Sequence, residues 1–282
     1  MSIDNMQVVC CKVDAAFRYW NCRLKNFLPG MLINEEYNQG FASRRIKGSQ
    51  ITLVSGHWPL DVYFARQTRS SIETYAKQHG YGLFYSEQPP QDSSVRGLHY
   101  ERCNILQKAG EMFPDSTWFV WLDTDVFVHR TDLRIESQLD LEDDRFLYHL
   151  FHEQPREYPI NTGVKFVHRD ALVHEKALYE IKNSPPWNEW PYEQKAMVEY
   201  LLPRIPGRYS INDPRVLNRI VFDHPFDLND SIFLHLCGTP TLTRNIIMFL
   251  RKHGITSPFV YLFLHVIKRI FRKSLSILKG SR

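Results

Sequence analysis

The run from Trp118 to His129, Trp-Phe-Val-Trp-Leu-Asp-Thr-Asp-Val-Phe-Val-His, constrains the fold of this chain more than any other feature. Its aromatic and β-branched residues favour a short buried strand over a helix. The strand ends in two carboxylates, Asp123 and Asp125, which are costly to bury unless a cation or a polar partner compensates. Ligands of open α/β sheets bind beyond the carboxyl ends of the strands. The run therefore predicts either a Mg²⁺ or Mn²⁺ site or a strand end with solvated acids.

The composition is that of a folded protein with a large core. The chain has 282 residues, of which 43% are hydrophobic and 13% aromatic, which excludes disorder for most of its length. Its five cysteines are odd in number and irregularly spaced, so they match neither a disulfide framework nor a zinc site. The first residues lack a secretory signal, and no apolar run is long enough to span a bilayer. We therefore expect a cytoplasmic protein with reduced thiols.

The charge is distributed unevenly along the chain. Residues 244–282 carry nine lysines and arginines and no acid, so the preceding residues carry a net charge of −5 within a total of +4. A nucleic-acid-binding domain would spread its basic residues across the fold, which argues against that class of protein. The distribution indicates an appended basic tail with a partner of its own.

Hydrophobic patterning predicts alternating strands and helices. Strands are expected at 49–56, 82–86, 118–122, 146–150 and 163–168, and helices at 61–79, 100–113, 172–181 and 192–202. Gly80 stands where a helix C-cap glycine belongs. This order predicts an α/β fold whose first strands form a parallel sheet with right-handed crossovers. We divide the chain into an N-terminal extension (1–48), the α/β domain (49–243) and the basic tail (244–282).

Several blocks resemble a known family of enzymes. They are Ile51–Ser55, His79–Tyr85, Trp118–Asp125, Asn161–Val164, Tyr192–Gln194 and Phe233–Gly238, and their order and spacing resemble the GT-A-fold glycosyltransferases. More narrowly, they resemble the retaining galactosyl- and xylosyltransferases of fungal mannan and plant xyloglucan synthesis. The resemblance covers about residues 50–240. It implies a GT-A-like fold, with a Rossmann-type nucleotide-binding sheet and a mixed-sheet acceptor half.

The resemblance implies a metal site for Mn²⁺ or Mg²⁺. Asp125 is expected to bind the ion directly, and Asp123 to bind either the ion or the ribose of the nucleotide. A metal held by two acids needs a further protein ligand, and the late His-x-x-Gly block offers His235 for that role. The alternative for His235 is a hydrogen-bonded core histidine.

Other residues are expected around the donor. Asn161, Thr162 and Gly163 lie at a loop-to-strand junction, where an amide can bond sugar hydroxyls and a glycine allows close approach, although a simple turn would also explain them. By resemblance, Glu193 and Gln194 hold the reacting sugar, although an acid in a first helical turn is also an ordinary dipole partner. Tyr192 stands where the family often has another acid. Arg102 is either a diphosphate ligand or part of a solvated helix face. An aromatic group, Trp187, Trp190 and Tyr192, suits either an acceptor platform or the core.

The sequence thus predicts an enzyme that transfers a hexose or pentose from a nucleotide sugar, expected to be UDP-linked, to a glycan or glycolipid, with retention expected from the family. One alternative is a glycogenin-like or lipopolysaccharide-type galactosyl- or glucosyltransferase, although Thr239-Pro240-Thr241 replaces the Lys-Pro-Trp typical of that family. Others are a nucleotide-sugar hydrolase and a non-catalytic glycan- or membrane-binding protein.

The basic tail has a possible partner of its own. Val260, Phe263, Ile267, Ile270 and Phe271 recur at helical spacing beside clustered lysines and arginines, which predicts amphipathic C-terminal helices. Such helices suit an anionic membrane surface, and they would make the protein peripherally membrane-associated. Packing on the catalytic domain, or an oligomer contact, would also explain the pattern.

Overall fold

The computed structural model describes residues 44–46, 50–58, 62–153, 159–221, 228 and 230–254. Nearly all of the predicted N-terminal extension and residues 255–282 of the predicted tail lie outside the described residues. The residues of the predicted amphipathic pattern, from Val260 onward, also lie outside the described residues.

The larger sheet of the described region has seven strands in the order β1-β3-β2-β4-β7-β6-β8. The parallel part consists of β2 (Ile51–Gly56), β3 (Gly82–Ser86) and β4 (Trp118–Leu122), with β1 (Arg44–Ile46) antiparallel at the edge. Beyond β4, the strand β7 (Asn161–His168) is antiparallel to both β4 and β6 (Tyr148–Phe151), and β8 (Tyr209–Asn212) is parallel to β6. The predicted Rossmann-type half and mixed half are therefore confirmed.

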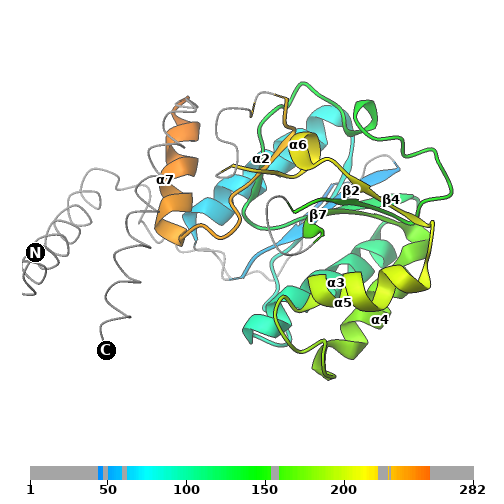
Figure 1. Cartoon of the computed structure of the whole chain (residues 1–282). Helices are drawn as coiled ribbons and strands as arrows, with labels where there is room; N and C mark the ends of the chain where they lie inside the picture. Colours follow the sequence, from blue (N-terminus) through cyan, green and yellow to red (C-terminus); the bar gives the residue numbers. More distant parts are fainter. Residues whose placement is uncertain are drawn as a thin grey trace, which may run out of the picture. The chain divides into compact units, whose positions relative to one another are not determined.

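Helices cover both faces of this sheet (Figure 1). On one face lie α3 (Val95–Met112), α4 (Leu172–Glu180) and α5 (Glu193–Ala196), and on the other lies α2 (Tyr63–His79). Adjacent strand residues point to opposite faces, so Leu53 joins the core beneath α2 while Val54 joins the core beneath α3. Two hydrophobic cores thus fix the sheet from both sides.

The sequence explains where the helices begin and end. At the end of α2, Gly80 has a φ of 71°, a left-handed conformation that a glycine adopts without steric cost. The helix α3 begins five residues before the predicted start, at Val95, because the Ser94 hydroxyl caps it by accepting a hydrogen bond from the Gly97 amide. The Ser-Ser-Val-Arg-Gly sequence before residue 98 is typical of a loop, so the helix was predicted to begin only at residue 100.

A second sheet of three strands lies beside the first. It contains β5 (Val126–Val128), β10 (Phe233–His235) and β9 (Arg219–Ile220), with β10 between the other two, and the short helix α6 (Pro214–Leu217) precedes β9. Because β5 directly follows Asp125, its antiparallel pairing with β10 brings His235 opposite Val126. This pairing brings together two distant blocks of the sequence, Trp118–Asp125 and Phe233–Gly238.

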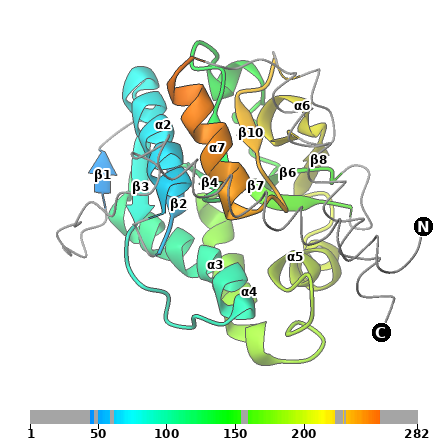
Figure 2. The same cartoon turned by 90° about the vertical axis from the view of Figure 1, so that its left-hand side faces the viewer.

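The helix α7 (Thr241–Lys252) packs against α2, and the two lie side by side in Figure 2. Ile247 and Met248 are buried on its inner face. The first residues of the predicted tail are therefore packed on the α/β domain, because the apolar stripe of α7 is covered by α2. No helix of the described region is long and apolar enough to cross a membrane.

Candidate active site

A cleft of about 540 Å³ opens at the carboxyl ends of β2, β3 and β4. The opposite wall comes from the beginning of β7, whose antiparallel direction brings its first residues to the same edge. The residues that line the cleft include every predicted site residue except Glu193: Arg102, Asp123, Asp125, Asn161, Thr162, Gly163, Gln194 and His235. Most of the predicted site therefore comes together in one cavity.

Asp123 is held in position from three sides. Its backbone amide donates to the Gly163 carbonyl over 2.7 Å, and one carboxylate oxygen accepts a hydrogen bond from the Trp121 indole at 2.8 Å. The same oxygen lies 3.2 Å from the Arg102 guanidinium. This side chain stays partly exposed to the cleft, so it is oriented by its partners and still accessible to a ligand.

Asp125 is almost fully buried and faces two basic side chains. One oxygen lies 3.2 Å from His235 Nε2, and the other lies 2.6 Å from an Arg244 guanidinium nitrogen on α7. Burial by itself would raise the pKa of Asp125, but His235 and Arg244 outweigh it and hold that pKa well below its usual range. The carboxylate is therefore ionised and ready to bind a cation at neutral pH.

The orientation of His235 is set by residues behind it. Its Nδ1 lies 3.1 Å from the Asn218 side-chain oxygen, which can only accept, so Nδ1 carries a proton and Nε2 is the ring nitrogen that faces Asp125. Asn218 is in turn held by Asn161, which accepts from its amide nitrogen at 3.1 Å. A partner of this kind on the far ring nitrogen is typical of metal-binding histidines.

The absence of a side chain at Gly163 leaves space for the imidazole of His235. A Cβ at this position would stand 2.1 Å from Cε1 of His235 and 2.7 Å from its Nδ1. The glycine therefore makes room for the imidazole. It also lines the cleft, and the close approach of a ligand there stays a prediction.

These residues fit a divalent cation. Asp123, Asp125 and His235 each offer a ligand atom, and the three atoms lie within 4.8 Å of one another. Two carboxylates and one imidazole suit Mn²⁺, and their oxygens also suit Mg²⁺. His235 Nε2 and an oxygen of Asp125 lie 3.2 Å apart, close enough for both to bind the same ion once Nε2 has no proton.

Asn161 and Gln194 are the predicted sugar-end residues whose side chains line the cleft. The Asn161 side-chain oxygen accepts from the Gly163 amide at 2.9 Å and from Asn218, while Gln194 donates to Glu153 at 2.8 Å. Thr162 lies between them, and its hydroxyl accepts from Arg102 at 2.8 Å. Arg102 is thus buried in the site, and the alternative of a solvated helix face is wrong.

Glu193 does not lie where the sequence predicted. Its carboxylate is 1% exposed and does not line the cleft, because one oxygen accepts from Lys165 at 2.7 Å and the other from the Thr162 hydroxyl at 2.9 Å. The predicted direct contact with a sugar therefore does not fit this structure. Glu193 reaches the cleft only through Thr162 and Arg102.

The predicted aromatic group divides between the core and the mouth of the cleft. Trp187 packs edge-on against Tyr200 at the core, with ring centroids 5.6 Å apart. Trp190 lines the cleft, is 68% exposed, and has the rings of His99 and Tyr192 at 5.5 and 5.6 Å. Tyr192 has a φ of 56°, which is strained for a bulky residue and is found most often at functional sites.

No pattern in the sequence indicated three residues of this region. Arg244 follows the His235 block, but its spacing does not distinguish it from the other basic residues of the tail. Asn218 is a single amide between short elements, and Lys165 stands in an apolar strand. Only the tertiary structure places them at or beneath the cleft.

Comparisons with known proteins show which families and structures this chain resembles. Residues 60–184 match the model of the galactosyl transferase GMA12/MNN10 family. A crystal structure of a glycosyltransferase involved in the glycosylation of the major capsid of PBCV-1 is 47% identical, with a TM-score of 0.70, over 71% of this chain and 98% of that one. The galactosyltransferase LgtC, solved with donor and acceptor sugar analogues, is 11% identical with a TM-score of 0.45, over 66% of this chain and 87% of that one. No curated protein matches the chain.

A mixed sheet with this cleft at its carboxyl edge defines the class as GT-A glycosyltransferase. The identity of 47% over nearly the whole of the relative shows the family, and the chain belongs to the GT-A glycosyltransferases. Within them it resembles the galactosyl transferase GMA12/MNN10 family, as the sequence predicted. The protein is therefore a transferase, and the alternative of a non-catalytic binding protein is not supported.

Proposed function

We propose that this enzyme transfers a sugar from a UDP-linked donor to a glycan or glycolipid acceptor in a reaction that requires Mn²⁺ or Mg²⁺. The observation that carries the proposal is the convergence of Asp123, Asp125 and His235 in one cleft, beside the guanidinium groups of Arg102 and Arg244. Two carboxylates and an imidazole suit a divalent ion, and two guanidinium groups suit a diphosphate. Retention of the anomeric configuration is proposed from the family resemblance.

The diphosphate end of the donor is proposed to lie at the metal residues. A divalent ion held by Asp123, Asp125 and His235 would supply Lewis-acid stabilisation of the charge that the departing diphosphate gains. Arg244 is bonded to Asp125 and lines the cleft, so its guanidinium can pass from the carboxylate to a phosphate oxygen. Asp123 keeps its orientation through Trp121 and Arg102 while the donor binds.

The sugar end is proposed to lie along the wall formed by β7 and α5. Asn161 and Gln194 present amide groups to the cleft, and amides both donate to and accept from hydroxyl groups. Trp190 at the mouth offers an exposed indole, which suits the apolar face of an acceptor sugar. The donor sugar would therefore sit between the metal residues and the aromatic mouth.

The proposal is tested first by donor selection. A thermal-shift screen of nucleotide sugars with and without Mn²⁺ should show one UDP-sugar stabilising the protein only when the metal is present, because a ligand that binds the native state raises its stability. Stabilisation by a different nucleotide, or no dependence on metal, would contradict the corresponding part of the proposal.

Turnover then separates transfer from hydrolysis. The selected donor is incubated with and without a panel of soluble glycans, and free sugar and extended glycan are measured. A transferase should form extended glycan and suppress free sugar when the acceptor is present. Equal release of free sugar under both conditions would favour the nucleotide-sugar hydrolase.

Membrane association is a separate part of the proposal and is supported by the sequence of residues 258–282 alone. Deleting these residues should release the protein from vesicles that contain anionic lipid and should leave transfer to a soluble acceptor unchanged. Continued sedimentation of the truncated protein with the vesicles would refute it.

A further inference from the structure

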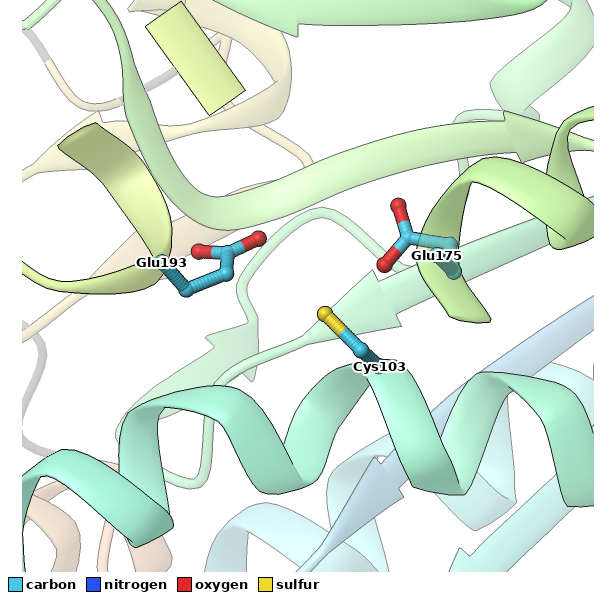
Figure 3. Close-up of side chains that lie close together, drawn as sticks. All are labelled: Cys103, Glu175 and Glu193. Atoms are coloured by element: carbon cyan, nitrogen blue, oxygen red, sulfur yellow. The ribbon is translucent and has the colours of Figure 1, made fainter. Parts of the chain in front are cut away.

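A buried charged cluster lies directly behind the cleft wall, between β7 and the helices that cover it. Figure 3 shows the side chains of Cys103 on α3, Glu175 on α4 and Glu193 on α5 converging on a common point. Lys165 on β7 is fully buried and extends its ammonium group between the two carboxylates. None of these four residues lines the cleft.

The lysine fills the place that a metal would take among these groups. Its nitrogen lies 3.0 and 2.8 Å from the two oxygens of Glu175 and 2.7 Å from Glu193. Burial by itself would lower the pKa of Lys165, but Glu175 and Glu193 outweigh it and raise that pKa, so the amine stays charged. An ammonium has three protons, and three carboxylate oxygens accept them.

Buried charges of this kind add little net stability compared with apolar residues. Replacing buried ion pairs with apolar residues of similar volume is often neutral or stabilising, because the charges lose their hydration. Tyr100, Leu106, Val167 and Leu178 belong to the same apolar core as Cys103. The presence of the charges at this place therefore needs a reason other than stability.

The cluster is connected to the cleft by an unbroken series of contacts. The Glu193 oxygen that does not contact Lys165 accepts the Thr162 hydroxyl proton at 2.9 Å. Arg102 donates to that hydroxyl at 2.8 Å and to the Thr162 carbonyl at 2.9 Å, and its other terminal nitrogen lies 3.2 Å from Asp123. Thr162, Arg102 and Asp123 all line the cleft.

We propose that Lys165 is a positioning residue of the transfer reaction: its ammonium holds Glu193 so that Thr162 and the start of α5, with Gln194, present their groups to the donor sugar. This proposal rests on the proposed function of the cleft. Glu193 is the first residue of α5, and Gln194 follows it in the cleft with its side-chain oxygen 3.4 Å from the Thr162 amide, so anchoring Glu193 also holds the start of α5 beside Thr162. Lys165 touches neither the donor nor the metal residues and acts through Glu193.

The two carboxylates on Lys165 provide a matched pair for the test. Glu175 and Glu193 are equally buried and contact the same ammonium, but only Glu193 has a second contact that leads to the cleft. Removing the charge of Glu175 perturbs the cluster without cutting the path to the cleft. Removing Lys165 removes the hydrogen bond that holds Glu193, the first residue of the series of contacts that leads to the cleft.

The experiment compares wild type, Lys165→Met, Glu175→Gln and the double variant, each assayed for kcat with the selected donor, for the Kd of UDP with Mn²⁺, and for Tm. Lys165→Met should lower kcat by about 10- to 100-fold, the range expected for a small displacement of reacting groups, while the Kd of UDP changes less than about threefold. Glu175→Gln should lower Tm but keep kcat within about threefold of wild type.

The double variant separates folding from positioning. It restores the charge balance of the cluster, so it should recover Tm relative to Lys165→Met and should still have the low kcat. If Lys165→Met fails to fold, the comparison of kcat is made between the double variant and Glu175→Gln.

Several results would overturn the inference. If kcat falls in proportion to Tm across the variants, or if the double variant regains wild-type kcat, the cluster serves the fold alone. Equal losses of UDP affinity and turnover would also refute it, because the proposed effect reaches the sugar end through Thr162 and Gln194, while Arg102 keeps its contacts with the Thr162 carbonyl and Asp123. A wild-type protein that binds no UDP-sugar and shows no turnover would refute the proposed function and this inference together.

Discussion

Gly163→Ala should damage the metal site while leaving the fold in place. The added methyl group would stand 2.1 Å from Cε1 of His235, whereas ordinary contacts lie at 3.4–4 Å. The imidazole must therefore move by about 1.3 Å, the difference between these distances. Metal–ligand distances tolerate only about 0.2 Å, so the displaced Nε2 no longer reaches an ion held by Asp123 and Asp125.

The size of the effect follows from what displaced ligands cost in other metal sites. Changes that disturb a ligating histidine weaken metal affinity by about 10- to 100-fold. At a metal concentration of about 100 times the wild-type Kd, the metal stabilises the native state by about 2.7 kcal/mol, and this gain should fall to about 1.4 or 0.4 kcal/mol in the variant. The overpacking itself should cost about 1–3 kcal/mol with or without metal.

The assay is a Mn²⁺ titration followed by Tm and by calorimetry, with Gly110→Ala as the control. A methyl group at Gly110 would stand 2.3 Å from the end of the Leu172 side chain, which overpacks the core away from the metal residues. The control should keep its full gain from metal, whatever its own change in stability. If Gly163→Ala binds Mn²⁺ as tightly as wild type, then His235 is not a ligand or its position is not set by Gly163.

Three further perturbations test other parts of the account. Trp190→Ala should raise the KM for a glycan acceptor by about two- to tenfold, since an aromatic contact contributes about 0.5–1.5 kcal/mol, and should leave donor hydrolysis unchanged. Unchanged acceptor kinetics would show that Trp190 does not contact the acceptor. Arg244→Met should tighten the binding of Mn²⁺ alone, because Asp125 loses a competing cation, and should weaken the binding of UDP by about tenfold. Parallel changes in both affinities would contradict the proposed contact of Arg244 with the diphosphate. Burial lowers the pKa of His149 from 6.5 to about 4, so the unfolded state takes up the proton first and the wild type should lose stability as the pH falls through this range. His149→Gln should flatten that loss in thermal melts between pH 7 and 4, and an unaltered slope would show that another group is responsible.

The sequence was sufficient for the elements whose pattern is local. The apolar run before Asp123, the helix that ends at Gly80 and the alternation of strands and helices predicted the Rossmann-type half, because hydrophobic spacing and a C-cap glycine are read directly from neighbouring residues. The family resemblance contributed His235, and the structure places it beside Asp125. The start of α3 was missed, since its serine cap resembles a loop sequence.

The parts that could not be predicted depend on contacts between distant segments. Glu193 has the residue type and position of a sugar ligand, and only the buried Lys165 opposite it shows that its carboxylate points away from the cleft. Arg244 enters the site because α7 packs on α2, which no spacing in the sequence reveals. A single sequence carries no record of which distant side chains meet.

The central claim is that Asp125 belongs to a metal site on which the nucleotide depends. Calorimetric titration of UDP into wild type and Asp125→Ala, each with Mn²⁺ and with EDTA, tests it most directly. The wild type should bind UDP at least about tenfold more tightly with Mn²⁺ than with EDTA, while Asp125→Ala should bind weakly and equally in both, with its folded state confirmed by circular dichroism. A variant that keeps the wild-type difference between Mn²⁺ and EDTA would contradict the account, because Asp125 would then have no part in holding the metal.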